Sequence, residues 1–234
     1  MATTTTLTFL TWNIHGRTLL GAREHEAEVA ELIRRSGADV VALQEVAAVD
    51  GERGQAERIA SLLGWHSTFA PNLLRGRLSF GNALLSRAPL STPRTVDLSQ
   101  PRREPRGCVM SESGGITFAS VHLGLAHRER ARQAARLTDA LASVGGPLVV
   151  GGDMNDWFPG RDTRAMRARL SDVQPGASYP ARLPLFRLDH VFHGPGVERV
   201  RAEVISSPIA RAASDHLPVV ATLAIAAGEA ARTA

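Results

Sequence analysis

Short apolar runs of strand length recur along the whole sequence, while only three longer segments show helical periodicity. Apolar runs bounded by turn-forming residues are typical of strands, and apolar residues at three- and four-residue spacing indicate amphipathic helices. These patterns predict strands at residues 7–14, 39–45, 83–85, 107–112, 116–122, 148–150, 188–192, 201–205 and 219–225, and helices at 24–35, 53–63 and 128–141. Many strands with few helices, some of them joined by hairpins, predict a mixed sheet or two packed sheets flanked by helices.

No internal repeat, linker or change of composition divides the 234 residues. We therefore expect one domain over residues 5–225 and a short tail over residues 226–234. The single cysteine, Cys108, excludes an intramolecular disulfide and a thiolate metal site. The apolar runs are shorter than the ~20 residues of a membrane span. Because the N-terminus also lacks the pattern of a secretory signal, we expect a cytoplasmic protein. A monomer is the default expectation for its oligomeric state.

All 27 cationic side chains are arginines, because the sequence has no lysine, and they outnumber the 23 acidic side chains to give a net charge of +4. This balance permits an anionic partner without requiring one, since the two signs are interspersed. Arginine side chains can bind a phosphate group through two parallel hydrogen bonds. Seven of them lie near the motifs described below and are candidates for that contact: Arg75, Arg77, Arg102, Arg103, Arg106, Arg182 and Arg187.

Polar side chains gather where the predicted strands begin or end. Those that follow an apolar run are Asn13, Glu45, His122, Asp153 and Asn155, and those that precede one are Asp189, Asp215 and His216. Antiparallel neighbours place the start of one strand beside the end of the next. All eight groups can therefore reach one edge of the sheets, where clefts form.

Four carboxylates, two imidazoles and two amides without a thiolate suit Mg²⁺, or Mn²⁺ in its place, rather than zinc. A zinc hydrolase is further disfavoured because none of the eight histidines forms a His-x-x-x-His pair. Mg²⁺ takes few protein carboxylates and keeps waters for a substrate phosphate, so the remaining carboxylates are free to orient a histidine. The inventory therefore predicts metal-assisted attack of water on a phosphate ester.

The same residues stand in seven short motifs. These are Thr11-Trp12-Asn13-Ile14-His15-Gly16, Leu43-Gln44-Glu45-Val46, Gly81-Asn82-Ala83-Leu84-Leu85-Ser86, Ser120-Val121-His122-Leu123, Gly152-Asp153-Met154-Asn155, Leu188-Asp189-His190-Val191-Phe192 and Ser214-Asp215-His216-Leu217-Pro218-Val219. In this order, they resemble the endonuclease/exonuclease/phosphatase family, the deoxyribonuclease-I-like superfamily of Mg²⁺-dependent phosphoesterases. The resemblance implies an α/β fold, a four-layered α/β/β/α sandwich of two mixed sheets flanked by helices.

The resemblance also implies a metal site. Glu45 matches the metal ligand of the family, and Asn13 matches the residue that supports the metal and the scissile phosphate. Asp215 is expected near the metal. His15 could line the mouth of the cleft and ranks below the other positions.

Five further positions match residues that act on the substrate. By resemblance His216 is the base that activates water or a contact of the phosphate, and Asp189 holds its imidazole in one tautomer. Asp153 orients or deprotonates the water, and Asn155 binds phosphate. His122 stabilises the transition state or protonates the leaving oxygen. Which carboxylate acts as the base stays open at this point.

The primary hypothesis is a divalent-metal-dependent phosphoesterase that hydrolyses a phosphodiester or phosphomonoester by in-line attack of activated water. The alternatives are a DNA endonuclease or exonuclease of the same superfamily, and a non-catalytic member that binds phosphate. The partner implied is a phosphate ester, with nucleic acid or a phospholipid headgroup among the candidates. Aromatic residues make up only 5% of the chain and there is no lysine-rich tail, so a base-stacking platform is not evident. No matched position is lost, which argues against a non-catalytic role.

Overall fold

The computed structural model describes residues 4–15, 22–158, 160–173 and 175–226. Within these ranges the strands are β1 (Thr4–Asn13), β2 (Val40–Val49), β3 (His66–Arg75), β4 (Leu78–Ser86), β5 (Arg94–Asp97), β6 (Gly107–Ser113), β7 (Ile116–His122), β8 (Leu148–Asp153), β9 (Ser171–Asp172), β10 (Asp189–His193), β11 (Val197–Val204) and β12 (Val219–Ala226). The helices are α1 (Ala22–Ser36), α2 (Gln55–Leu63), α3 (His127–Leu141), α4 (Arg164–Arg167) and α5 (Pro208–Ala213). None of these helices is long and apolar enough to cross a membrane.

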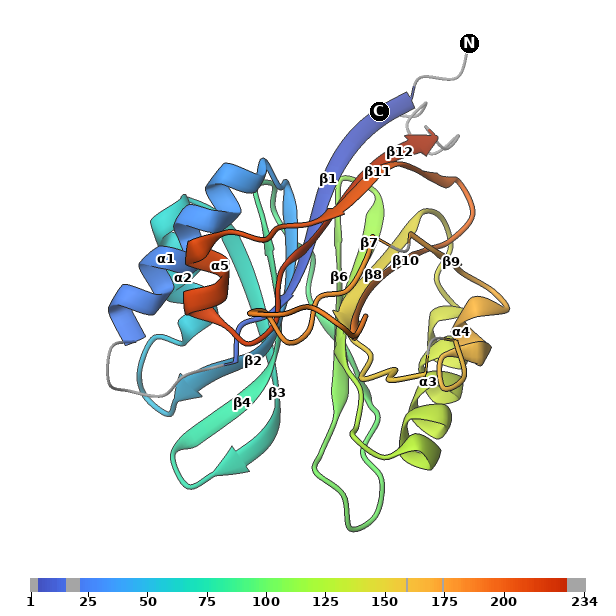
Figure 1. Cartoon of the computed structure of the whole chain (residues 1–234), viewed down its shortest axis with the longest axis horizontal. Coiled ribbons are helices and arrows are strands. Elements are labelled where there is room, and N and C mark those ends of the chain that lie inside the picture. Colours follow the sequence, from blue (N-terminus) through green and yellow to red (C-terminus); the bar gives the residue numbers. More distant parts are fainter. Residues whose placement is uncertain (1–3, 16–21, 159, 174, 227–234) are drawn as a thin grey trace.

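The strands form two mixed sheets that face each other. The first sheet has the strand order β11-β12-β1-β2-β4-β3, and the second has the order β5-β6-β7-β8-β10-β9. Figure 1 shows α1, α2 and α5 outside the first sheet, and α3 and α4 outside the second. In each sheet one parallel pair, β1 with β2 and β7 with β8, lies among antiparallel neighbours.

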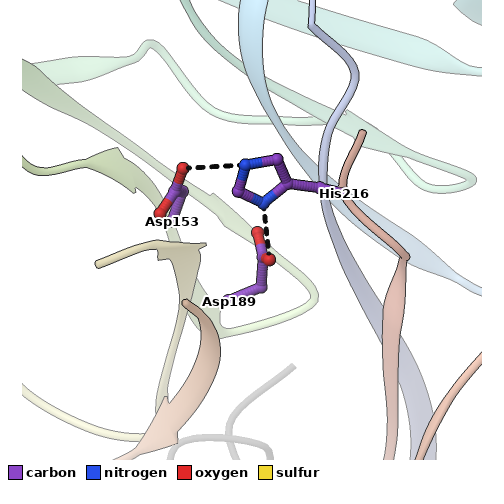
Figure 2. Close-up of side chains that lie close together, drawn as sticks. All are labelled: Asp153, Asp189 and His216. Carbon is purple, nitrogen blue, oxygen red and sulfur yellow. Dashed lines mark hydrogen bonds and ion pairs between the residues drawn. The ribbon is translucent and has the colours of Figure 1, made fainter. Parts of the chain in front are cut away.

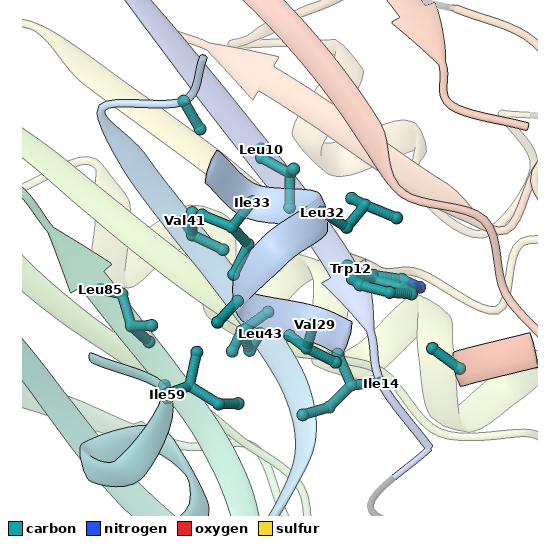
Figure 3. Close-up of a cluster of buried hydrophobic side chains, with 14 of the residues drawn as sticks. Leu10, Trp12, Ile14, Val29, Leu32, Ile33, Val41, Leu43, Ile59 and Leu85 are labelled. Carbon is teal, nitrogen blue, oxygen red and sulfur yellow. The ribbon is translucent and has the colours of Figure 1, made fainter. Parts of the chain in front are cut away.

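Three layers of apolar side chains separate these four layers of secondary structure, because successive residues of a strand point to opposite faces. In β1, Phe9 packs between the two sheets, where its ring stacks on Phe118 of β7 with centroids 5.9 Å apart. Leu10 and Trp12 point the other way, toward α1 and α2 (Figure 3). Leu148 and Val150 of β8 form the third layer with α3. The four-layered α/β/β/α sandwich expected from the resemblance is therefore confirmed.

The structure contains elements that the sequence patterns did not predict. The largest is β3, which lies at the edge of the first sheet and pairs only with β4. Pro71 interrupts its strand pattern, and the register shifts between Pro71 and Leu73. Proline cannot donate to a ladder and is confined to edge strands and bulges, so β3 is a strand that sequence periodicity understates. The short elements β5, β9, α4 and α5 were also missed.

Candidate active site

Three neighbouring strands of the second sheet place one functional side chain each in a single row. His122 ends β7 and pairs with Asp153 at the end of the parallel strand β8. Asp189 begins β10 and pairs with the same Asp153, because β10 runs antiparallel to β8. The expectation that strand starts and strand ends meet at one edge is thus confirmed for these three residues.

Two glycines before Asp153 allow this row to lie close to its neighbours. A Cβ atom on Gly152 would stand 2.0 Å from the backbone oxygen of Val121 in β7. A Cβ atom on Gly151 would stand 2.5 Å from the ring of Phe9 in the facing sheet. Only residues without a side chain fit here, so the Gly-Gly-Asp order sets how closely β7 and the facing strand β1 approach β8 next to Asp153.

Glu45 enters the site because β2 contains a β-bulge. Leu43 and Val46 both pack toward the helices, although residues three apart in a regular strand face opposite sides. The pairing of β2 with β4 shifts between these two residues, and Glu45 takes a left-handed backbone conformation with φ of 55°. The bulge turns Glu45 out of the ladder and into the cleft described below.

Asn13, at the end of β1, connects the two sheets. Its buried Nδ2 donates to Glu45 Oε1 at 3.0 Å in the first sheet and to Asp153 Oδ2 at 3.1 Å in the second. The backbone N–H of His15 donates to Asn13 Oδ1 at 2.9 Å. All hydrogen-bonding groups of this amide are thus occupied by protein, and the amide fixes the spacing of the two carboxylates.

The loop before β12 supplies Asp215 and His216 and is tied to β1. Ser214 Oγ donates to the backbone oxygen of Asn13 at 2.7 Å and accepts from the backbone N–H of His216 at 3.1 Å. The indole Nε1 of Trp12 donates to the backbone oxygen of His216 at 2.9 Å. The buried tryptophan of the core therefore holds the loop that carries the imidazole.

His216 lies between two buried carboxylates (Figure 2). Its Nδ1 is 2.8 Å from Asp189 Oδ2, and its Nε2 is 3.6 Å from Asp153 Oδ2. Burial alone would lower the pKa of His216, but the charges of Asp189 and Asp153 outweigh it and raise the pKa to about 10. The imidazole is therefore protonated at neutral pH, with one N–H bonded to Asp189 and the other facing Asp153.

For Asp153, burial has a larger effect on the pKa than the neighbouring charges and hydrogen bonds do. Burial raises its pKa to about 6, although the imidazolium of His216 and the backbone N–H of Asn155 act to lower it. That N–H donates to Asp153 Oδ1 at 2.9 Å. A carboxylate with a pKa near neutrality can exchange a proton at physiological pH.

His122 is the second imidazole of the site, and its environment keeps it neutral. Burial lowers its pKa well below the usual value, and the nearby positive charges of Arg106 and His216 lower the pKa further. Arg106 Nη1 donates to His122 Nδ1 at 3.1 Å, which assigns the ring proton to Nε2. The amide nitrogen of Asn155 is itself a donor, so with this assignment it is a neighbour of Nε2 and not its hydrogen-bond partner. That Nε2 lies 3.4 Å from Asp153 Oδ2 and 3.2 Å from Asn155 Nδ2.

A cleft of about 440 Å³ opens between the two sheets and is lined by residues of both. Six of the eight predicted site residues line it: Glu45, His122, Asp153, Asn155, Asp215 and His216. The two others, Asn13 and Asp189, are buried behind it and bond to lining residues. The left-handed conformations of His15, Glu45 and Asn155 also cluster here, as backbone strain does at functional sites.

Two groups of residues could hold a cation. Asp153, Asp189 and His216 bring ligand atoms within 4.8 Å of one another, but Asp189 is fully buried and already bonded to His216. Glu45 and Asp215 instead line the cleft with side chains that are 35% and 44% exposed. His15 Nδ1 lies between them, 3.5 Å from Glu45 Oε2 and 3.6 Å from Asp215 Oδ1. Two hard carboxylates that converge on one position in the cleft fit Mg²⁺ better than the buried group does.

Sequence reasoning named Arg75 and Arg106 as candidates but missed Ser178 and the contact of Arg106 with His122. Arg75 and Arg106 line the cleft, whereas the other five candidate arginines do not. The contact of Arg106 with His122 follows from the β6–β7 hairpin, whose register pairs Cys108 with Val121 and leaves Arg106 near the end of β7. The register of the predicted hairpin could therefore have indicated that Arg106 lies near His122. Ser178, whose Oγ donates to Asp189 Oδ2 at 2.6 Å, stands in no motif and had no such signal.

Comparison with known proteins places the chain in a family. The model of the Endonuclease/Exonuclease/phosphatase family matches residues 10–216. The uncharacterized protein YbhP of Escherichia coli strain K12 is 28% identical, over 92% of this chain and 94% of YbhP. The structure of mannosyl-6-phosphatase Bt3783 from Bacteroides thetaiotaomicron superposes with a TM-score of 0.74 at 16% identity, covering 93% of this chain and 99% of that one. D. rerio TDP2, complexed with single strand DNA product, superposes with a TM-score of 0.74 at 15% identity, covering 93% and 98%. The chain therefore belongs to the endonuclease/exonuclease/phosphatase family.

Proposed function

We propose that this protein is a divalent-metal-dependent phosphoesterase that hydrolyses a phosphodiester or phosphomonoester by in-line attack of an activated water. The observation that carries the proposal is the convergence of Glu45, Asp153 and His216 on one cleft, from three motifs spread over the sequence. Two structural neighbours support the substrate class, because one is named a phosphatase and the other holds a DNA product.

Glu45 and Asp215 would hold the cation, Mg²⁺ or alternatively Mn²⁺, since their carboxylates converge on one position in the cleft. When bound, the cation polarises the phosphate and makes a bound water more acidic. Asn13 acts from behind, because its amide holds the carboxylate of Glu45 in place by the 3.0 Å hydrogen bond.

The geometry favours Asp153 as the base and His216 as a contact of the phosphate. A protonated imidazole cannot accept a proton from water, and Asp189 stabilises the protonated form of His216 through the 2.8 Å hydrogen bond. The Nε2–H of His216 is then a donor for an anionic phosphate oxygen. Asp153, 3.6 Å from that nitrogen, keeps a carboxylate oxygen in the cleft that can take a proton from the attacking water.

His122 and Asn155 complete the proposed site. His122 keeps its proton on Nε2, because Arg106 donates to Nδ1. A neutral N–H donor suits the negative charge that develops on the phosphate or on the leaving oxygen. Asn155 Nδ2 donates to the backbone oxygen of Leu123 at 3.0 Å, which fixes the amide beside that imidazole.

The proposal is tested with bis-p-nitrophenyl phosphate and p-nitrophenyl phosphate in the presence of Mg²⁺, Mn²⁺ or EDTA. We expect hydrolysis with a divalent cation, loss of hydrolysis in EDTA, and a rate about 10²- to 10⁴-fold lower in His216→Ala. His66→Ala is the matched control, because His66 is exposed and does not line the cleft. Hydrolysis that survives both chelation and His216→Ala contradicts the mechanism.

A further inference from the structure

Five polar side chains line one wall of the cleft, and of these only Arg106 has a part in the reaction proposed above, as a donor to His122. Asn72 and Arg75 come from β3, Asn82 from β4, and Glu104 and Arg106 from the segment that leads into β6. These strands pack against one another, so residues from two sheets meet at this wall of the cleft. Their number and their charges suggest a second binding position beside the reacting groups.

Arg106 is a nearly buried cation with an incomplete set of partners. Its side chain is only 11% exposed, yet the carboxylate with which it pairs is the partly exposed Glu104, at 3.1 Å from Nη2. Its Nη1 is bonded to His122. Its Nε has no hydrogen-bond partner among residues that the structure describes. A buried guanidinium with an unused N–H is costly unless a ligand completes its bonding.

Glu104 bridges two arginines in the way a bound oxyanion would. Its Oε1 faces Arg106, and its Oε2 lies 3.7 Å from Arg75 Nη2. Two guanidinium groups that converge on two oxygens form a common phosphate site in proteins. The side chain of Glu104 is 44% exposed, so it can swing into solvent when an anionic ligand takes its place beside the two guanidinium groups.

A buried amide at the same wall also lacks a partner. Asn82 Nδ2 donates to the backbone oxygen of Gly107 at 2.7 Å, which fixes the orientation of the amide. Its Oδ1 is buried and unpartnered within the described part of the chain. An acceptor of this kind suits a hydroxyl group next to the anion, such as that of a sugar.

We propose that Arg75 and Arg106 form a subsite for a second phosphate of the substrate, and that Glu104 occupies this subsite when no ligand is bound. The inference rests on the proposed function and narrows its substrate to a phosphoester that carries a neighbouring phosphate on the same sugar. The spacer is short, because one guanidinium group, that of Arg106, contacts both His122 and Glu104. A single-stranded nucleic acid and a nucleoside 3′,5′-bisphosphate both offer this chemistry.

The binding test compares thymidine 3′,5′-bisphosphate with thymidine 5′-monophosphate by calorimetry, in EDTA and again with Mg²⁺. We expect the bisphosphate to bind about tenfold more tightly than the monophosphate, as for one added charge-assisted contact. Glu104→Gln removes the competing carboxylate and should raise this preference about threefold to fivefold. Arg75→Gln should abolish most of the preference for the bisphosphate over the monophosphate.

Arg77→Gln is the matched control, because Arg77 follows two residues after Arg75, is exposed, and donates to the backbone oxygen of Asp50 outside the cleft. It should keep the wild-type preference. Equal affinity for the two nucleotides, no rise in Glu104→Gln, or an unchanged preference in Arg75→Gln would each overturn the assignment.

Two further comparisons distinguish the possible sources of the ligand and separate the subsite from the proposed function. A thymidine tetranucleotide that binds more tightly than the bisphosphate identifies a nucleic-acid strand as the ligand, and the reverse order identifies the small molecule; either supports the subsite. The 5′-p-nitrophenyl esters of thymidine 5′-phosphate, with and without a 3′-phosphate, give the corresponding ratio of kcat/KM. If neither ester is hydrolysed but the bisphosphate preference responds to Glu104→Gln, the proposed function fails while the subsite stands.

Discussion

Replacement of Asp189 by Asn isolates the contribution of one buried charge to the site. Asp189 is fully buried and does not line the cleft, so the substitution acts on the substrate through His216 and through Asp153, whose pKa the charge of Asp189 helps to raise. Its Oδ2 accepts from Ser178 Oγ at 2.6 Å and from His216 Nδ1 at 2.8 Å. Its Oδ1 has no partner among the described residues, so the carboxylate is incompletely solvated. An amide of the same shape therefore removes the charge without opening a cavity.

The size of the effect follows from the bond to His216. A hydrogen bond to a charged group contributes ~1.5–3 kcal/mol, and one pKa unit corresponds to ~1.4 kcal/mol. In the wild type, the negative charge of Asp189 offsets the lowering effect of burial on the pKa of His216 and helps to raise it to about 10. Without that charge the pKa should therefore fall by ~1–2 units or more. If His216 must donate Nε2–H to the phosphate, the loss of kcat at alkaline pH should begin ~1–2 pH units lower in the variant than in the wild type.

The same shift predicts how stability depends on pH in the metal-free protein. Because the pKa of His216 is raised above its ordinary value of 6.5, its contribution to stability is fully present below pH 6.5 and is lost as the pH rises toward 10. Asp189→Asn should flatten this fall in the free energy of unfolding. The total loss of the wild type across that window is on the order of a few kcal/mol.

Three measurements check this reasoning: NMR titration of the His216 ring, urea unfolding across the window, and kcat against pH with Mg²⁺. Ser178→Ala is the control, since it removes one hydrogen bond to the same carboxylate and leaves the charge. It should shift the titration of His216 less than Asp189→Asn does. A variant Asp189→Asn with the wild-type titration of His216 and the wild-type dependence of kcat on pH would refute the account.

Two other substitutions probe the cation site and the packing beneath it. Glu45→Gln should weaken activation by Mg²⁺ at least about tenfold. Because the side chain of Glu45 is 35% exposed, the free energy of unfolding should change by less than ~1 kcal/mol. A titration of the hydrolysis rate with Mg²⁺ checks this, and unchanged activation would remove Glu45 from the cation site. Gly152→Ala should destabilise the fold by more than ~2 kcal/mol in urea unfolding, since its Cβ would stand 2.0 Å from the backbone oxygen of Val121. Gly145→Ala, whose Cβ would meet nothing within 4 Å, should change stability by less than ~0.5 kcal/mol, and equal unfolding midpoints of the two variants would show that β8 tolerates a side chain there.

Local patterns predicted a mixed sheet or two packed sheets flanked by helices, and the edge at which the polar groups meet. The four-layered order came from the resemblance to the family. Alternating residues such as Phe9 and Leu10 reveal which strands are buried on both faces. The positions of Asp153 and Asp189 at a strand end and a strand start indicated the shared row that the register confirms.

Other features depend on contacts between segments far apart in the sequence and could not be predicted in this way. The β-bulge at Glu45 appears only when Leu43 and Val46 are seen in the same core. The hydrogen bond from Ser178 to Asp189 depends on the path of a loop, and no periodic pattern describes it. The bridge of Glu104 between Arg75 and Arg106 joins an edge strand, which the sequence understated, to a loop.

The single amide of Asn13, which bonds to Glu45 in one sheet and to Asp153 in the other, has a mechanical consequence. The two walls of the cleft belong to different sheets, which are joined here by apolar packing and by polar crosslinks such as that of Gln44 to Ser120. A small sliding of one sheet over the other would separate the carboxylates long before the chain unfolds. On heating, activity should therefore be lost at a lower temperature than secondary structure. The two hydrogen bonds of Asn13 should determine the difference between these temperatures.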